Sequence, residues 1–174
     1  EIDPPERRYR QFLQPISPRR GGYRSFKIKG DGQGPRSVKF LLDTCVISAL
    51  RKPRENASLV EWISNVDESD LYLSAITIGE LEKGVSRLPE SKKKAAVSEW
   101  VRHAVTNRFG NRVLPIDAAV AACWGELIGA REKKGKTLPI LDAFIVATAI
   151  MADCTIVTRN TKDFADCGVR LLNP

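Results

Sequence analysis

One segment organises this 174-residue chain: Phe40-Leu41-Leu42-Asp43-Thr44-Cys45-Val46-Ile47-Ser48-Ala49-Leu50. Three apolar residues run into an aspartate and a threonine, and a second apolar run at helical spacing follows. This order predicts a short buried strand that ends at a carboxylate and continues directly into a helix. In open α/β sheets, ligand sites form outside the carboxyl ends of the strands, so Asp43 stands where chemistry is usually done. An aspartate here is equally suited to cap the helix, and the segment alone leaves both roles open.

The rest of the chain alternates between predicted helices and strands. Apolar residues at helical spacing predict helices near residues 59–66, 76–86, 91–109, 117–135 and 138–150. Short apolar runs predict strands at residues 71–73, 113–114, 155–157 and 169–172, with a helical turn at 162–165. Strands that alternate with helices indicate an α/β fold, with a central parallel sheet covered by helices on both faces.

The first 37 residues differ from the remainder in composition. Five prolines and two glycine-rich runs interrupt any helical or strand periodicity there. Residues 1–39 carry ten Lys and Arg against four Asp and Glu, whereas residues 40–174 carry eighteen against seventeen. We therefore expect a basic N-terminal arm or linker over residues 1–37 and a nearly neutral globular domain over residues 38–174. Aromatic residues interleave with arginines in the arm, a pattern that suits stacking on single-stranded RNA or docking on a partner.

Several classes of protein and site are disfavoured by composition. No run of eighteen apolar residues is present, so we expect no membrane span, and no secretory signal is visible. The four cysteines lie far apart without a CxxC pair, which favours a reducing cytoplasmic environment over a disulfide framework. His103 is the only histidine and falls on the polar side of its predicted helix, which argues against zinc and Ser-His-Asp sites.

Oxygen ligands recur at equivalent places in the predicted fold. Asp142 lies in the first turn of a buried helix, and Glu80 lies one turn into a helix that follows a strand. Asn160 follows another strand end, with Asp163 three residues later. Carboxylates brought together without a cation repel one another, and Mg²⁺ or Mn²⁺ relieves that repulsion. Such an ion lowers the pKa of water and polarises a phosphoryl oxygen, which predicts metal-assisted phosphodiester hydrolysis without a histidine base. Taken singly, each acid also has an ordinary role as a cap or a solvent-facing side chain.

Four sequence blocks, in this order and spacing, resemble the signature blocks of PIN-domain ribonucleases. They are FLLDTCVIS at residues 40–48, LSAITIGEL at 73–81, LDAFIVATA at 141–149 and VTRNTKDF at 157–164. The blocks are most similar to those of VapC/FitB-type toxins from bacterial toxin–antitoxin pairs, and the resemblance covers about residues 38–174. It implies a PIN fold, a three-layer α/β/α sandwich around a central parallel sheet. It also implies a metal-dependent ribonuclease, a homodimer, and a cognate antitoxin that inhibits the enzyme and binds operator DNA.

The resemblance assigns roles to individual residues. Asp43, Glu80 and Asp142 match the three acidic metal ligands of the family, and Thr44 and Thr158 match hydroxyl positions beside them. Asn160 stands where some relatives carry aspartate, and Asp163 is expected to supply the remaining carboxylate. These two complete the set of expected catalytic residues.

Cys45 occupies a place that is often asparagine in the family. We expect its thiol to lose the hydrogen bond that an amide would make to the site. Together with Asn160, this substitution leaves open whether one metal ion is bound or two.

The leading hypothesis is therefore an endoribonuclease toxin that hydrolyses RNA with water activated by Mg²⁺ or Mn²⁺. A second hypothesis is a catalytically inert PIN module that binds RNA or protein as a scaffold, which the Asn160 substitution favours and the intact acids disfavour. A third takes Asp43 as a phospho-acceptor in a receiver-type fold. Arg159 disfavours that hypothesis because it stands where such a fold requires a lysine.

Overall fold

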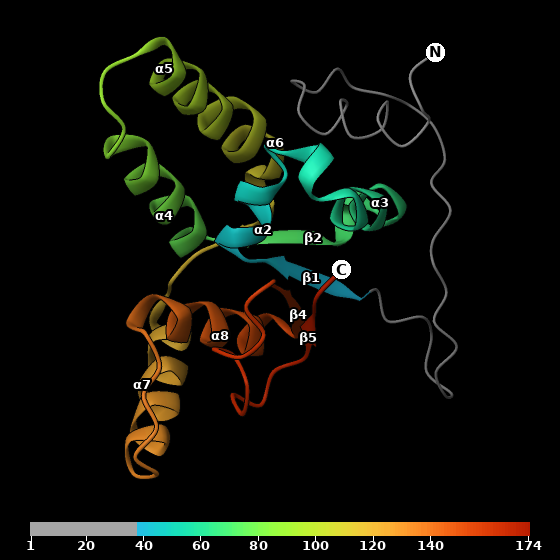
Figure 1. Ribbon diagram of the computed structural model, residues 1–174. Coiled ribbons are helices and arrows are strands. Elements are labelled where there is room, and N and C mark those ends of the chain that lie inside the picture. Colours follow the sequence, from blue (N-terminus) through green and yellow to red (C-terminus); the bar gives the residue numbers. More distant parts are fainter. Residues whose placement is uncertain (1–37) are drawn as a thin grey trace.

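The computed structural model describes residues 38–174, which form a five-stranded sheet flanked by helices (Figure 1). The strands lie in the order β3-β2-β1-β4-β5, and each pair of neighbours is parallel. Their bounds are β1 Lys39–Leu42, β2 Leu71–Ser74, β3 Val113–Leu114, β4 Cys154–Val157 and β5 Leu171–Leu172. The prediction of an α/β fold with a central parallel sheet is confirmed.

The central strand is β1, and its register sets the position of the candidate site. Leu41 pairs with Tyr72 of β2 on one side and with Ile156 of β4 on the other. Leu41 and Leu42 are fully buried, as expected of a strand that helices cover on both faces. Because β1, β2 and β4 run in the same direction, the residues that follow them meet at one edge of the sheet.

Helices cover both faces of the sheet, which gives the three-layer α/β/α arrangement that the family resemblance implies (Figure 1). One buried cluster joins the sheet to α2, α3, α4 and the α5–α6 region, and the other joins it to α7 and α8. The helices are α2 Thr44–Ala49, α3 Ala57–Asn65, α4 Ala75–Ser86, α5 Lys92–Glu99, α6 Asn107–Phe109, α7 Ala118–Glu132 and α8 Ile140–Ala152. The short 3₁₀ turns are η1 Pro53–Glu55, η2 Glu68–Asp70 and η4 Gly110–Arg112.

The helix predicted over residues 91–109 is continuous but not α-helical throughout. It begins as predicted, because the Ser91 hydroxyl accepts a hydrogen bond from the Lys94 backbone N–H. Its middle, η3 Trp100–Thr106, is a π-helix. The backbone N–H of Asn107 donates to the carbonyl of Arg102, five residues earlier, as π-helical geometry requires. A hydrophobic pattern with a period of 3.6 residues does not distinguish a short π-helical stretch from the α-helix around it.

Residues 162–165 form a single turn, in which the backbone N–H of Ala165 donates to the Lys162 carbonyl at 3.3 Å. The last strand is shorter than predicted and is limited to Leu171–Leu172. Asp166 and Gly168 have positive φ angles of 59° and 73°, which interrupt regular structure before the strand.

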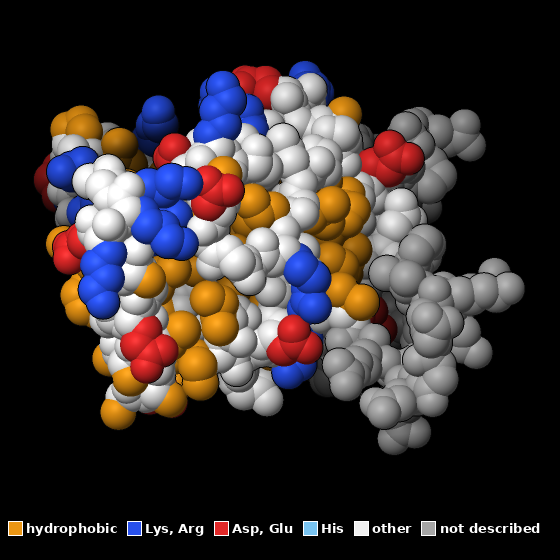
Figure 2. Space-filling view, turned by 90° about the horizontal axis from the view of Figure 1, so that it is seen from below, with side chains coloured by type: hydrophobic (Ala, Val, Ile, Leu, Met, Phe, Trp, Pro, Cys, Tyr) orange, Lys and Arg blue, Asp and Glu red, His pale blue; other side chains and the backbone are white. Residues whose placement is uncertain are grey.

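Helix α8 is less completely buried than its apolar composition predicts. Its central residues from Ile145 to Ala149 are buried, but Ile140 is 63% exposed and Met151 is 51% exposed. Hydrophobic side chains are also visible among Lys and Arg on the face of the molecule seen from below (Figure 2). Apolar composition therefore identified the helix but not the exposure of its two ends.

The chain from 38 to 174 holds no helix with the length and apolar character needed to cross a bilayer. The predicted arm, residues 1–37, lies outside the described residues.

A charged network fixes the α6–η4 segment against the start of β2. Glu68 accepts hydrogen bonds from Arg108 Nε at 2.9 Å and from Arg112 Nη2 at 2.8 Å. Arg112 also donates to the Leu71 carbonyl at 3.1 Å. The two arginine side chains are 9% and 16% exposed, so one carboxylate compensates two nearly buried guanidinium groups.

We predict that Glu68→Gln destabilises the fold by about 2 kcal/mol, because it leaves two buried cations with a neutral partner. Glu90→Gln is the matched control, since Glu90 pairs with Lys94 at the surface and its loss is expected to cost less than about 0.5 kcal/mol. Urea unfolding of both variants measures the difference. Equal free energies of unfolding for the two variants would contradict the structural role of the network.

Candidate functional site

Asp43 combines the two roles that the sequence left open. It directly follows β1, and its backbone N–H donates to the Val157 carbonyl at 3.0 Å, which ties it to the end of β4. It also caps α2, because its Oδ1 accepts a hydrogen bond from the Thr44 backbone N–H at 2.7 Å. Only 7% of Asp43 is exposed. A carboxylate that is capping, buried and at the carboxyl edge of the sheet is held in one position.

The second carboxylate oxygen of Asp43 accepts two side-chain hydrogen bonds. The Thr158 hydroxyl, which follows β4 and is fully buried, donates to Oδ2 at 2.8 Å. The same hydroxyl accepts from the backbone N–H of Asn160 at 3.0 Å, so its orientation is fixed from both sides. The predicted position of Thr158 beside the acidic site is thus explained by a direct bond to Asp43.

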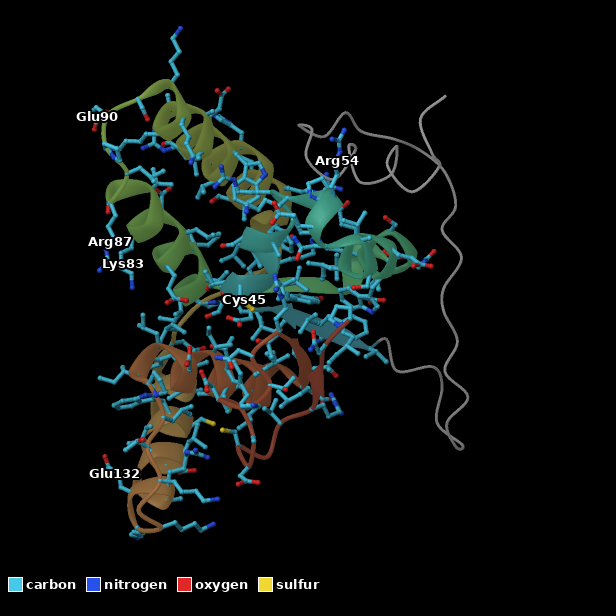
Figure 3. All side chains as sticks on the ribbon, viewed as in Figure 1. Cys45, Arg54, Lys83, Arg87, Glu90 and Glu132 are labelled. Atoms are coloured by element: carbon cyan, nitrogen blue, oxygen red, sulfur yellow. The ribbon has the colours of Figure 1, made fainter. Side chains whose placement is uncertain are left out.

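Cys45 is the other donor to Asp43 Oδ2, with an Sγ to Oδ2 distance of 3.0 Å. Burial, and next the charge of Asp43, raise the pKa of the Cys45 thiol, so the thiol keeps its proton and donates it. Cys45 lies in the middle of the molecule, between α4 and α8 (Figure 3). The expectation that cysteine loses this hydrogen bond was wrong. A small thiol two residues after Asp43 reaches the carboxylate across the first turn of α2.

Glu80 reaches the same edge of the sheet from α4. Its Oε2 accepts a hydrogen bond from the Thr44 hydroxyl at 2.6 Å, and Thr44 is the residue next to Asp43. Helices α2 and α4 pack against each other, which brings the two residues within reach. The predicted role of Thr44 beside the acids therefore has a specific form, a bridge between the Asp43 segment and Glu80.

The pKa of Asp142 is affected by its burial and by the neighbouring acids. It lies half-buried in the first turn of α8. Burial, followed by the negative charges of Asp43, Glu80 and Asp163, raises the pKa of Asp142 to about 6 from an ordinary 3.8. Charges from three other parts of the chain influence one carboxyl group only when they lie within electrostatic range of it.

Asn160 and Asp163 lie at the rim of this group of acids. Both are exposed, and the Asn160 amide nitrogen donates a hydrogen bond to Asp163 Oδ2. Asn160 is also joined through its backbone to Thr158. The residues predicted from sequence at four separate blocks thus converge on one edge of the sheet.

The chemistry of this group fits a hard cation, although its geometry is open. Its donors are carboxylate, hydroxyl and amide oxygens, the ligands that Mg²⁺ and Mn²⁺ prefer. Among residues 38–174, however, no three acidic, cysteine or histidine side chains approach one another closely enough to form a ready-made ion site. The acids therefore share an electrostatic field without forming a closed group.

Comparison with known proteins identifies the fold family. The PIN domain family matches residues 40–169, which include all four sequence blocks. The chain belongs to the PIN domain family. This membership removes the receiver-type hypothesis for Asp43.

Relatives of this PIN domain include named bacterial toxins. Toxin FitB of Neisseria gonorrhoeae is 37% identical over 134 residues, which cover 77% of this chain and 96% of FitB. VapC ribonuclease Y4jK of Sinorhizobium fredii is 32% identical, with the same coverage. The tRNA(fMet)-specific endonuclease VapC of Shigella flexneri is 29% identical, over 75% of this chain and 93% of its own length.

Solved structures of such proteins superpose on this PIN domain. FitAB bound to an IR36 DNA fragment gives a TM-score of 0.73 at 36% identity, over 78% of this chain and 94% of the matched chain. DNA-bound VapBC from Salmonella typhimurium gives a TM-score of 0.64 at 26% identity, over 78% and 97% of the two chains. Those proteins carry the fold described above in complexes with a second protein and DNA.

The raised pKa of Asp142 has a measurable consequence. Because the folded protein binds the Asp142 proton more tightly than the unfolded chain, ionisation destabilises the fold as pH rises from about 4 to about 6. Asp142→Asn removes that ionisation. In EDTA at pH 7.5, we predict that this variant is more stable than the parent by about 1 kcal/mol after solvent screening, or about 3 °C in Tm.

The difference is expected to vanish at pH 4, where the parent carboxyl is protonated. Glu132→Gln, an exposed neutralisation on α7, is the control and shifts Tm by less than about 1 °C at either pH. Thermal unfolding followed by circular dichroism gives both values. A Tm difference for Asp142→Asn that does not change with pH would show that the neighbouring charges are not responsible.

Proposed function

We propose that this PIN domain is a metal-dependent endoribonuclease toxin of a toxin–antitoxin pair. The observation that carries the proposal is the hydrogen-bonded group at the carboxyl edge of the sheet, where Thr158 and Cys45 hold Asp43 and Thr44 holds Glu80. Relatives named as ribonucleases and toxins, matched over nearly their whole length, support the same activity.

In this proposal Asp43, Glu80 and Asp142 hold a Mg²⁺ or Mn²⁺ ion. When bound, such an ion supplies polarisation of a phosphoryl oxygen and a lowered pKa for a nearby water molecule. Its charge offsets the mutual repulsion that the three acids otherwise suffer. The only histidine, His103, is not among the proposed site residues. Hydrolysis at neutral pH therefore requires another base, and water of lowered pKa beside the bound ion would provide it.

The remaining residues orient the acids. Thr158 and Cys45 fix one oxygen of Asp43, and Thr44 fixes one oxygen of Glu80. Asn160 and Asp163, joined by a hydrogen bond at the rim, complete the proposed catalytic set. Loss of such supporting bonds usually costs 10–100-fold in metal affinity or activity, so the supports matter nearly as much as the ligands.

We further propose that the protein forms a homodimer and is inhibited by a cognate antitoxin that binds operator DNA. The support is the match to FitAB and to VapBC from Salmonella typhimurium, both described as bound to DNA, and to a toxin–antitoxin complex from Klebsiella pneumoniae. Residues 1–37 are proposed as an arm separate from the PIN domain, over residues 38–174.

A second function has specific support. Asn160 adds no charge, and no three ligating side chains among the described residues form a closed group. Both features favour a catalytically inert PIN module that binds RNA or protein as a scaffold. An Asn160→Asp variant separates the two proposals, since it adds a carboxylate beside the four acids already present and is expected to give activity to an inert parent.

The direct test uses purified full-length protein and a single-stranded RNA labelled at both ends. We predict cleavage at internal positions in 5 mM Mn²⁺ or Mg²⁺ (roughly physiological to saturating for such sites) and none in EDTA. Asp43→Asn is expected to reduce the cleavage rate by at least about 100-fold, because it removes a ligand rather than a supporting bond.

Asp117→Asn is the matched control. Asp117 caps α7 as Asp43 caps α2, accepting from Val120 N–H at 2.9 Å, and asparagine caps a helix equally well. This variant is expected to retain full activity. Cleavage that persists in EDTA, or an Asp43→Asn variant as active as Asp117→Asn, would overturn the proposed function.

A further inference from the structure

One strip of α4 carries two cations that lead away from the acidic site. Glu80, Lys83 and Arg87 are three and four residues apart, the spacing that places side chains on one face of a helix. Lys83 lies about 5 Å and Arg87 about 10 Å along the helix axis from Glu80. Figure 3 shows the two basic side chains extending from the same side of α4, the side toward α8 and α7.

Neither cation is engaged by the protein itself. Within residues 38–174, no side-chain hydrogen bond or ion pair involves Lys83 or Arg87, and both are exposed. Some other basic side chains of the domain do have partners. Arg159 donates to Asn56, and Arg51 lies over the Trp100 ring.

Gly84 keeps the strip open between the charged residues. A side chain at this position would meet no atom within 4 Å, so the surface beside Glu80 and Arg87 is bare. A strand of nucleic acid lying along this strip would therefore meet two cations and no bulky side chain at position 84.

We propose that Lys83 and Arg87 bind the backbone phosphates of single-stranded RNA next to the cleavage point. This inference rests on the proposed function and names the path of its substrate. The acids repel a polyanion, so a substrate that approaches Asp43 and Asp142 needs compensating cations nearby. The α4 strip supplies them one and two helical turns from Glu80. Phosphate contacts of this kind hold RNA irrespective of its bases.

The alternative is that Lys83 and Arg87 only stabilise α4. Lys and Arg near a helix C-terminus interact favourably with the helix dipole, and Lys83 lies in the last turn of α4. That role changes stability but not RNA affinity. The test must therefore measure RNA binding and its salt dependence as well as the Tm.

The experiment measures binding of a fluorescent single-stranded RNA to the full-length protein in EDTA, between 50 and 200 mM KCl, the range in which phosphate contacts are sensitive to salt. Each phosphate contact contributes about 0.7 to the slope of log Kobs against log salt. We expect Lys83→Gln/Arg87→Gln to lower the slope by about 1.4 and to weaken binding about tenfold at the lower salt. The Tm is expected to stay within about 2 °C of the parent value.

Lys133→Gln/Lys134→Gln is the charge-matched control. Both lysines are exposed and follow the end of α7 that lies away from α4 (Figure 1). This control is expected to change the slope by less than about 0.3.

The outcomes separate the inference from the proposed function. RNA binding with the expected loss of slope supports the α4 path even if the protein fails to cleave RNA, in which case the nuclease proposal alone is overturned. Equal slopes for the two double variants overturn the α4 path even if the protein cleaves RNA. A lowered Tm with an unchanged slope also overturns it, because only the dipole role remains. Absence of RNA binding in the parent overturns it as well.

Discussion

The hydrogen bonds that hold Asp43 are the constraint on which the rest of the site depends. A carboxylate exposed to only 7% is costly to ionise unless donors compensate for lost water. Three donors do so here: the Thr44 backbone, the Cys45 thiol and the Thr158 hydroxyl. They come from α2 and from the end of β4, so the compensation exists only when β1 and β4 pair in register. Fold and site are therefore specified together.

The other acids are less well compensated than Asp43. Glu80 accepts one hydrogen bond from the Thr44 hydroxyl, and Asp142 is half-buried beside the negative charges of its neighbours. This imbalance has a direct chemical meaning. One acid is fixed as an anchor, while the field around Asp142 is unsatisfied and would favour a cation. Lys83 and Arg87 on α4 are positively charged and lie beside the negatively charged acids. The cations are suited to the phosphates of a nucleic-acid ligand, and the acids to the metal ion at its cleavage point.

Sequence reasoning predicted the sheet, its parallel order and the convergence of the acids, because these follow from strong local patterns. The apolar runs before Asp43 and Thr158 identify buried strands, and strand ends of a parallel sheet share an edge. It could not predict the π-helix at Trp100–Thr106, which is a local change within a continuous helix. Nor could it predict how short β5 is, which follows from the positive φ angles at Asp166 and Gly168. The prediction for Cys45 was wrong because the thiol was expected not to replace the hydrogen bond of an asparagine amide, whereas it donates to Asp43. Burial beside Asp43 raises the pKa of the thiol further, so the thiol stays protonated and donates to the carboxylate.

The central claim is that acids from separate parts of the chain share one divalent ion. Anomalous diffraction from a crystal soaked in Mn²⁺ tests it most directly, because it locates the ion without reference to activity. The account predicts a strong anomalous peak within about 2.2 Å of carboxylate oxygens of both Asp43 and Asp142. A fully occupied Mn²⁺ bound only elsewhere on the protein, with no peak between these two residues, would contradict it.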